Sequence, residues 1–303
     1  MVGAVPAEDL PGDVSSKGYG AKHLQLPPPP LPAPPKQQQQ QPDVEAESGW
    51  FEEEIDDDLK LCYALNSPET VFIMGGGEGS AAREVLRHKA VQRVVMCDID
   101  QEVVDFCRTY LTVNRQAFSS EKLRLIINDA RAELEKREEK FDVIVGDLAD
   151  PVEGGPCYQL YTKSFYELIV KPKLNDHGIF VTQAGPAGVL THKQVFSSIY
   201  NTLRHVFKYV QAYTAHVPSF ADTWGWVMAS DHPFDLTAQQ IDERIRDRIE
   251  GGEVAYLSGK FFISSTTLNK SVHQSLLNET HVYTEDDARF IYGHGRACRA
   301  VSS

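Results

Sequence analysis

The sequence has little of what secreted, membrane-inserted or nucleic-acid-binding proteins depend on. Its 5 cysteines are odd in number and lack C-x-x-C spacing, so we expect reduced thiols. No run of 18 apolar residues and no charged-then-apolar leader is present, which argues against membrane insertion and secretion. A net charge of −13 argues against binding of nucleic acid through its phosphates. Together these absences predict a cytoplasmic protein, and no pattern of metal ligands is apparent.

The excess of acidic residues is compatible with a cationic ligand, because an acidic cleft concentrates cations. Many proteins are acidic merely for solubility, so charge alone does not decide between the two readings. Residues 1–45 differ from the rest of the chain in that they are rich in proline and include a run of five glutamines over 37–41. Such a segment cannot bury enough apolar surface to offset its ordering entropy, so we predict a disordered tail over 1–45.

From Thr70 onward, short apolar runs alternate with amphipathic segments. The pattern predicts strands over 71–74, 94–97, 123–127, 141–145 and 178–183, followed by two further strands, 209–217 and 224–228, with no helix between them. It predicts helices over 81–88, 102–114, 130–137, 163–170, 192–206 and 238–249, with an irregular segment after the last. Alternating strands and helices indicate an α/β fold. We therefore expect a Rossmann-like sheet of seven strands over 70–303, mainly parallel, with an antiparallel edge hairpin, as in transferases that use S-adenosyl nucleosides.

Polar or glycine residues follow each of the first three predicted strands. The glycine-rich stretch 75–79 comes directly after the first strand and opens a helix, as in loops that let a nucleotide approach the backbone. Asp98 ends the second strand, where a carboxylate can accept both ribose hydroxyls. An N-cap before Gln101 is the alternative role for Asp98. Because the ends of parallel strands meet at one edge of a sheet, these elements together predict a nucleoside site; its residues would be Gly75, Gly77, Glu78, Asp98, Asp129 and Ala130.

Glu78 lies inside the glycine loop and bears on the choice of nucleoside. A carboxylate there would repel a pyrophosphate but would pair with a cationic amine. Decarboxylated S-adenosylmethionine carries such an amine and lacks the carboxylate of S-adenosylmethionine. We therefore expect decarboxylated S-adenosylmethionine as a co-substrate and no tightly bound cofactor; a methyltransferase on the same sheet is an alternative that Glu78 disfavours.

Two acids, Asp147 and Asp150, follow the fourth predicted strand and precede Pro151. A primary amine has a pKa near 10, like that of lysine, so it must lose a proton before it can act as a nucleophile. We predict that Asp147 is the base and that Asp150 holds a second ammonium group of the same substrate. Capping of local backbone amides in a turn is the alternative.

Three further residues are candidates for the substrate slot. Gln183 ends the fifth predicted strand on the same side and could bond the substrate. Phe220 and Trp224 could line the slot for methylene groups, although aromatic residues at this density more often belong to a core.

These motifs resemble those of the spermidine and spermine synthase family, the polyamine aminopropyltransferases. The resemblance covers most of the chain from about Trp50 to Met228 and is carried by residues 74–80, 96–100, 127–133, 146–151, 160–166 and 221–226. It implies that Glu78 meets the aminopropyl amine, Asp98 the ribose, and Asp129 with Ala130 the adenine. It likewise implies that Asp147 accepts the proton and Asp150 binds the polyamine.

Within the family, Glu78 and the pair Leu148–Ala149 resemble the members that form thermospermine. The resemblance therefore implies transfer of an aminopropyl group to spermidine, giving thermospermine and 5′-methylthioadenosine, with spermidine synthase and spermine synthase as alternatives. It also implies assembly as a homo-oligomer.

The chain departs from the family between Ser67 and Pro68. Family members carry a small N-terminal β-domain before the first sheet strand, with a segment that closes over both substrates. Here residues 46–69 are a remnant of that region and run directly into the first strand. Because a lid supplies acceptor contacts and excludes water, a weakly active or inactive variant that binds nucleoside or a full-length subunit is the alternative to an active enzyme.

Overall fold

A computed structural model describes residues 67–155 and 157–291 of the chain. The predicted tail over 1–45 and nearly all of the 46–69 segment lie outside the described residues. Among the helices in the described ranges, none combines the length and apolar character needed to cross a bilayer.

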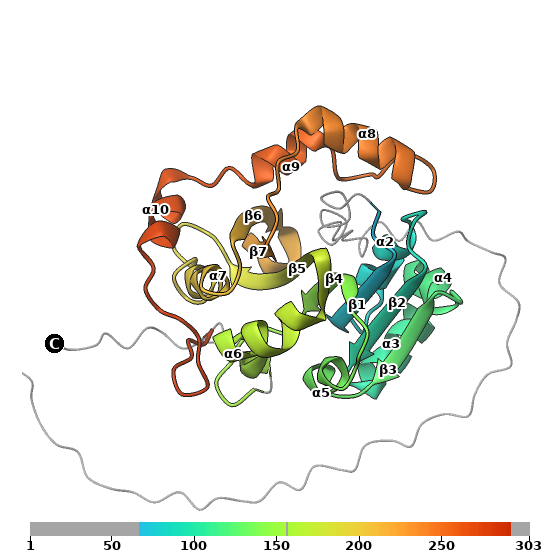
Figure 1. Cartoon of the computed structure of the whole chain (residues 1–303), viewed down its shortest axis with the longest axis horizontal. Coiled ribbons are helices and arrows are strands. Elements are labelled where there is room, and N and C mark those ends of the chain that lie inside the picture. The colour runs from blue at the N-terminus through green and yellow to red at the C-terminus, as the bar shows by residue number, and fades with distance from the viewer. Residues whose placement is uncertain (1–66, 156, 292–303) are drawn as a thin grey trace, which may run out of the picture. The chain divides into compact units, whose positions relative to one another are not determined.

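The described residues form one seven-stranded sheet in the order β3-β2-β1-β4-β5-β7-β6 (Figure 1). Strands β1 to β5 pair in parallel, whereas β7 pairs antiparallel with both β5 and β6. The predicted mainly parallel sheet with an antiparallel edge hairpin is confirmed. The strands are β1 (Thr70–Gly75), β2 (Arg93–Asp98), β3 (Leu123–Ile127), β4 (Phe141–Asp147), β5 (Leu174–Pro186), β6 (Tyr209–Val217) and β7 (Asp222–Ser230).

The central strand β1 shows why the parallel strands are continuous apolar runs. Successive side chains of a strand point to opposite faces of the sheet. Val71 and Ile73 belong to the core on one face, and Phe72 and Met74 to the core on the other, all four without exposure to solvent. Both faces are covered by helices, so none of these four side chains faces water.

Helices from different parts of the chain cover the two faces. The first face carries α2 (Ser80–Leu86), α4 (Arg115–Phe118), α8 (Ala238–Arg248) and α9 (Gly259–Ser265). The second carries α5 (Ala130–Glu135), α6 (Lys163–Phe165), the π-helical turn Tyr166–Val170, α7 (Phe196–Arg204) and α10 (Lys270–Asn278). Figure 1 shows α8 beside α9. α3 (Gln101–Tyr110) follows β2 and buries Val104 and Cys107.

The helices predicted over 192–206 and 102–114 are each several residues shorter than expected. The helix expected over 192–206 begins only at Phe196, because the backbone N–H groups of Thr191 and His192 bond to Gly188 O in a turn. The Thr191 hydroxyl donates to Asp222 Oδ2 at 2.7 Å and holds that turn against β7. The helix expected over 102–114 ends at Tyr110 and is followed by a 3₁₀ turn.

The prediction that the chain is irregular after residue 249 is wrong. α9 and α10 lie in that segment, and each begins at a polar cap: Ser258 accepts from Phe261 N, and Asn269 accepts from Val272 N. Helices of 7 and 9 residues are marginal alone and form here because Phe262, Val272 and Leu276 pack into the two cores.

Candidate active site

The glycine loop after β1 is held against the end of β4. Gly76 N donates to Asp147 O at 3.2 Å. Gly75 has φ +80°, and a β-carbon on it would lie 2.0 Å from that same carbonyl oxygen. The backbone of Asp147 therefore leaves no room for a side chain at position 75, which explains why this residue is glycine.

Asp98 connects the end of β2 to the glycine loop. Its Oδ2 accepts from Gly77 N at 2.9 Å, and its Oδ1 accepts from Asp100 N at 2.8 Å. A β-carbon on Gly77 would lie 2.7 Å from Asp98 Oδ2, so a side chain at this position would force the Asp98 carboxylate to move. The N-cap of α3 is Asp100, whose side chain accepts from Glu102 N and Val103 N. The alternative that Asp98 serves as this helix cap is therefore wrong.

Asp129 follows β3 and caps α5. Its Oδ1 accepts from Ala132 N at 2.8 Å, and Ala130, the first residue of the helix, is buried. The cap fixes the side chain while leaving Asp129 exposed at the mouth of the crevice.

A cavity of about 180 Å³ lies where these strand ends meet. It is lined by Gly75, Asp98, Asp129, Ala130 and Asp147. Five of the residues predicted from sequence are therefore brought together at the carboxyl ends of β1 to β4. Sequence reasoning missed the rest of the lining: Cys97, Ile99, Arg131, Leu148, Ala149, Cys157, Gln159 and Leu160.

The missed residues supply much of the cavity's apolar wall. Ile99 and Leu148 directly follow Asp98 and Asp147 in the sequence, each just after the end of a strand. That position is the feature of the sequence that could have predicted them as residues of the cavity lining. Burial, reinforced by the Glu133 carboxylate, raises the pKa of the Cys97 thiol to about 12, and burial also raises the pKa of Cys157. Both thiols are thus neutral at physiological pH and act as packing groups rather than nucleophiles.

Gly77 and Glu78 do not line this cavity. Burial raises the pKa of Glu78, and the neighbouring Asp98 carboxylate raises it further, whereas Arg83 acts in the opposite direction. Burial and the nearby Asp98 carboxylate both disfavour the ionised form of Glu78. A cation bound next to these two carboxylates would offset both of these contributions.

Asp147 and Asp150 take different positions at the end of β4. Asp147 lines the cavity, and its Oδ2 approaches the glycine loop closely enough that a β-carbon on Gly76 would lie 3.1 Å away. Asp150 lies outside the cavity lining, and burial raises its pKa. Its Oδ1 accepts from Gln183 Nε2 at 3.1 Å.

Gln183 is 9% exposed and connects β5 to the loop after β4, which carries Asp150. Its Nε2 lies within hydrogen-bonding distance of Leu148 O (2.9 Å) and Tyr161 Oη (2.7 Å) as well as Asp150. Its Oε1 accepts from Gly185 N at 2.9 Å and Trp224 Nε1 at 3.1 Å. Both ends of the amide therefore have protein partners, and the prediction that Gln183 bonds the substrate stays a prediction.

The two aromatic candidates are neighbours. The ring centroids of Phe220 and Trp224 lie 4.5 Å apart, and Phe220 is 44% exposed. Trp224 is half-buried and pairs with Pro186 of β5, next to the Gln183 site. Neither lines the cavity between the strand ends, so their role as the wall of a polyamine slot stays a prediction.

Comparison with known proteins gives a consistent result. A family model described as "Spermine/spermidine synthase domain" matches residues 59–239. Thermospermine synthase ACAULIS5 of Arabidopsis thaliana is 57% identical over 306 residues, covering 83% of this chain and 90% of that protein. Polyamine aminopropyltransferase 2 of Hyperthermus butylicus is 40% identical over 241 residues, covering 78% of this chain and 77% of that protein.

The fold matches that of a solved structure, spermidine synthase from Thermotoga maritima, with a TM-score of 0.62 and 24% identity over 72% of this chain and 71% of that one. A second structure, a spermidine synthase in complex with the transition state analogue AdoDATO, has a TM-score of 0.62 and 23% identity, covering 72% of this chain and 71% of that one.

The alignment with the Arabidopsis protein also shows a difference in length. The 83% of this 303-residue chain amounts to about 251 residues, against 306 aligned positions, so about 55 positions have no counterpart here. These positions lie inside the aligned span and not beyond its ends.

Proposed function

The chain belongs to the spermine/spermidine synthase family, and from that premise we propose that it transfers the aminopropyl group of decarboxylated S-adenosylmethionine to spermidine. The products would be thermospermine and 5′-methylthioadenosine. The observation that carries the proposal is the convergence of Asp98, Asp129 and Asp147 on one cavity at the carboxyl ends of β2, β3 and β4, with the glycine loop of β1 between them. An acidic crevice of this kind suits two cationic substrates, because it concentrates cations and repels anions.

The donor nucleoside would occupy the cavity between the glycine loop and α5. Asp98 would accept the ribose hydroxyls, and Asp129 with the backbone at Ala130 would meet the adenine edge. Ile99 and Leu148 would supply apolar surface for the base. Glu78 would pair with the aminopropyl ammonium, which would favour the ionised form of this buried carboxylate.

The chemical step would be a displacement at the carbon next to the sulfonium. Asp147 would accept a proton from the attacking ammonium of spermidine, which frees the nitrogen lone pair. A new C–N bond would form as the C–S bond breaks, and the electron pair of the broken bond would neutralise the sulfonium. The leaving group would be the neutral thioether 5′-methylthioadenosine, and the proton on Asp147 would pass to solvent.

The acceptor would extend away from Asp147 past Asp150. The buried Asp150 carboxylate would gain a second ammonium as its counterion, and Phe220 with Trp224 would contact the methylene groups. The choice of spermidine as acceptor and thermospermine as product is supported by the similarity to the Arabidopsis protein. We also propose a cytoplasmic location and a homo-oligomer, in line with the cysteine pattern and the family.

The direct test is incubation of the purified full chain with decarboxylated S-adenosylmethionine and either putrescine or spermidine. We expect thermospermine and 5′-methylthioadenosine in equal amounts from spermidine, measured by chromatography that separates thermospermine from spermine. A parallel reaction with S-adenosylmethionine should give no product. Product from putrescine alone would refute the assignment of acceptor, and transfer of a methyl group would refute the family reaction.

A second candidate function is binding without turnover. The specific observation in its favour is the group of about 55 aligned positions that this chain lacks relative to the Arabidopsis protein. If the missing segment supplied acceptor contacts and excluded water, nucleoside binding would survive without catalysis. Calorimetric binding of 5′-methylthioadenosine together with absence of polyamine product would favour this second function over the first.

A further inference from the structure

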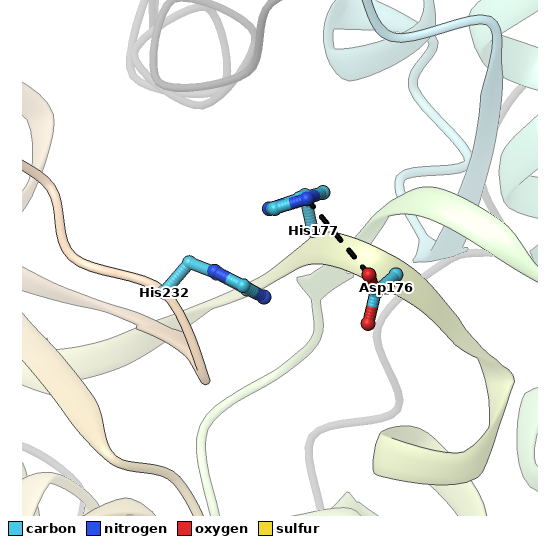
Figure 2. A group of neighbouring side chains, drawn as sticks. All are labelled: Asp176, His177 and His232. Atoms are coloured by element: carbon cyan, nitrogen blue, oxygen red, sulfur yellow. Dashed lines mark ion pairs between the residues drawn. The ribbon is translucent and has the colours of Figure 1, made fainter.

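Three potential metal ligands lie together at the edge of the sheet opposite Asp147. β4 and β5 are parallel, and Leu174 at the start of β5 pairs with Phe141 at the start of β4. β7 runs antiparallel to β5, so the end of β7 returns to this same edge. Asp176 and His177 lie near the start of β5, and His232 lies two residues beyond β7 (Figure 2).

The sheet register explains why Asp176 and His177 project from the strand. Phe141 pairs with Leu174 and Val143 with Ile179, so residues 175–178 have no counterparts in β4 and bulge from the ladder. Bulges re-aim side chains and are common beside functional sites. Asn175, at the start of the bulge, donates from Nδ2 to Asp142 Oδ1 at 2.7 Å, which fixes the residue preceding Asp176.

One buried hydroxyl fixes the spacing between the two histidines. Ser230, which is 1% exposed, donates from Oγ to Gly178 O at 3.0 Å and accepts from His232 N at 3.1 Å. It therefore connects the residue after His177 with the backbone of His232. The neighbouring Asp231 is anchored as well, by an ion pair with Lys171 at 2.9 Å.

The ligand atoms of the three side chains all lie within 4.8 Å of one another. The imidazole centroids of His177 and His232 are 4.0 Å apart, and His177 Nε2 lies 3.8 Å from Asp176 Oδ2. Ligand atoms bound tetrahedrally to zinc are separated by roughly 3.3 Å, given bonds of about 2.0–2.1 Å. The His177 and Asp176 side chains are 69% and 93% exposed, so small rotations can close the remaining distance while the backbone stays fixed.

The surroundings favour a cation over an anion. The three residues line an open hollow of about 520 Å³ together with Asp142. Asp142 accepts from Glu69 N, Thr70 N and Asn175 Nδ2, which holds its pKa low despite its partial burial, so it stays ionised without being a ligand itself. Two imidazoles and one carboxylate form a donor set typical of zinc and its neighbours in the first transition row.

We propose that Asp176, His177 and His232 bind one zinc(II) ion, with water completing the coordination. The ion links the bulge of β5 to the segment that leaves β7 toward α8. Its role is structural and not catalytic, because it lies at the edge of the sheet opposite the end of β4 where Asp147 is found. The two histidines are about 55 residues apart in the chain, so no local spacing of metal ligands marks this site in the sequence.

The test is titration of the full chain, previously treated with a chelator, with zinc in competition with a chromophoric chelator. We expect one zinc per chain, and His177→Ala and His232→Ala should each weaken binding at least tenfold. His273→Ala removes an exposed histidine on α10 and should leave binding unchanged. Absence of zinc binding to the unmodified chain, or equal binding by the His177→Ala/His232→Ala double variant, would overturn the proposal.

Cobalt(II) provides a second measurement, because its visible spectrum reports the ligands of the bound ion. A tetrahedral cobalt site with imidazole and carboxylate ligands absorbs visible light far more strongly than aqueous cobalt. We expect this absorption with the unmodified chain and with His273→Ala, and its loss in His177→Ala. Asp176→Asn should shift the spectrum and weaken binding, while a spectrum that all variants share would refute the assignment of ligands. Aminopropyl transfer is measured separately and should be unaffected, so failure of one proposal does not imply failure of the other.

Discussion

Replacement of Gln183 by methionine is the sharpest test of what positions the loop after β4, which carries Leu148 and Asp150. Methionine has nearly the same shape but removes every hydrogen bond of the amide. The Gly185 N–H, now bonded to Gln183 Oε1 in a buried setting, would lose its partner. Leu148 O and Asp150 Oδ1 would lose the donor that holds them against β5.

The magnitude follows from which partners are left unsatisfied. Tyr161 Oη retains its bond to Ala149 O, and the half-buried Trp224 can reach water, so the main costs arise at Gly185 N and Leu148 O. An unsatisfied buried group costs about 1–3 kcal/mol, and we expect a loss of about 2–4 kcal/mol in the free energy of unfolding. For a domain of this size that corresponds to a fall in melting temperature of about 4–16 °C.

Gln183→Glu is the matched variant, because it keeps the acceptor for Gly185 N and Trp224 Nε1. Its second oxygen would face Leu148 O and the Asp150 carboxylate, both acceptors. Only the protonated acid can donate there, so the pKa of the new acid should be raised. A raised pKa gives stability that is present at low pH and lost as pH rises, so Gln183→Glu should recover toward the wild type on acidification while Gln183→Met should not.

The assay is thermal unfolding of the three proteins at about pH 5 and about pH 7.5, together with KM for spermidine. A melting temperature of Gln183→Met within about 1 °C of the wild type would refute the positioning role. If KM rose while the melting temperatures of both variants stayed unchanged, Gln183 would instead be a direct contact of the substrate.

Three further predictions concern the loop and the two acids. Asp147→Asn keeps the shape but not the proton acceptor, so turnover should fall about 10²- to 10⁴-fold while calorimetric binding of 5′-methylthioadenosine is unchanged; unaltered turnover would exclude Asp147 as the base. Gly75→Ala should lower the free energy of unfolding by about 2–4 kcal/mol in denaturant titration, because of φ +80° and the contact with Asp147 O. Gly154→Ala is its control, since φ is +77° there but no atom lies within 4 Å of the added carbon, and equal losses would exclude the clash. Burial raises the pKa of Asp150, so its ionisation opposes folding: the linked stability is complete below the unfolded pKa and is lost as pH rises through the folded one. Asp150→Asn should therefore melt higher than the wild type at neutral pH and raise KM for spermidine, and a lower melting temperature would contradict this sign.

Sequence reasoning located the cavity because parallel topology makes strand ends coincide. Once apolar runs and helices alternate, residues directly after strands must gather at one edge of the sheet, and Asp98, Asp129 and Asp147 do so. Glu78 does not line the cavity, because the turn of the five-residue glycine loop decides where that side chain goes, and its pairing with the aminopropyl amine stays a prediction.

Local pattern determined the strands, because periodicity is a property of short segments. The alternation of strands and helices along the chain indicated a mainly parallel sheet, which places the three acids at one rim. Only the tertiary structure decided that Gln183 holds the Asp150 loop, that α9 and α10 form, and that His177 and His232 face one another. These features depend on partners tens of residues away in the chain. Their distances are set by sheet register and core packing, which no local pattern encodes.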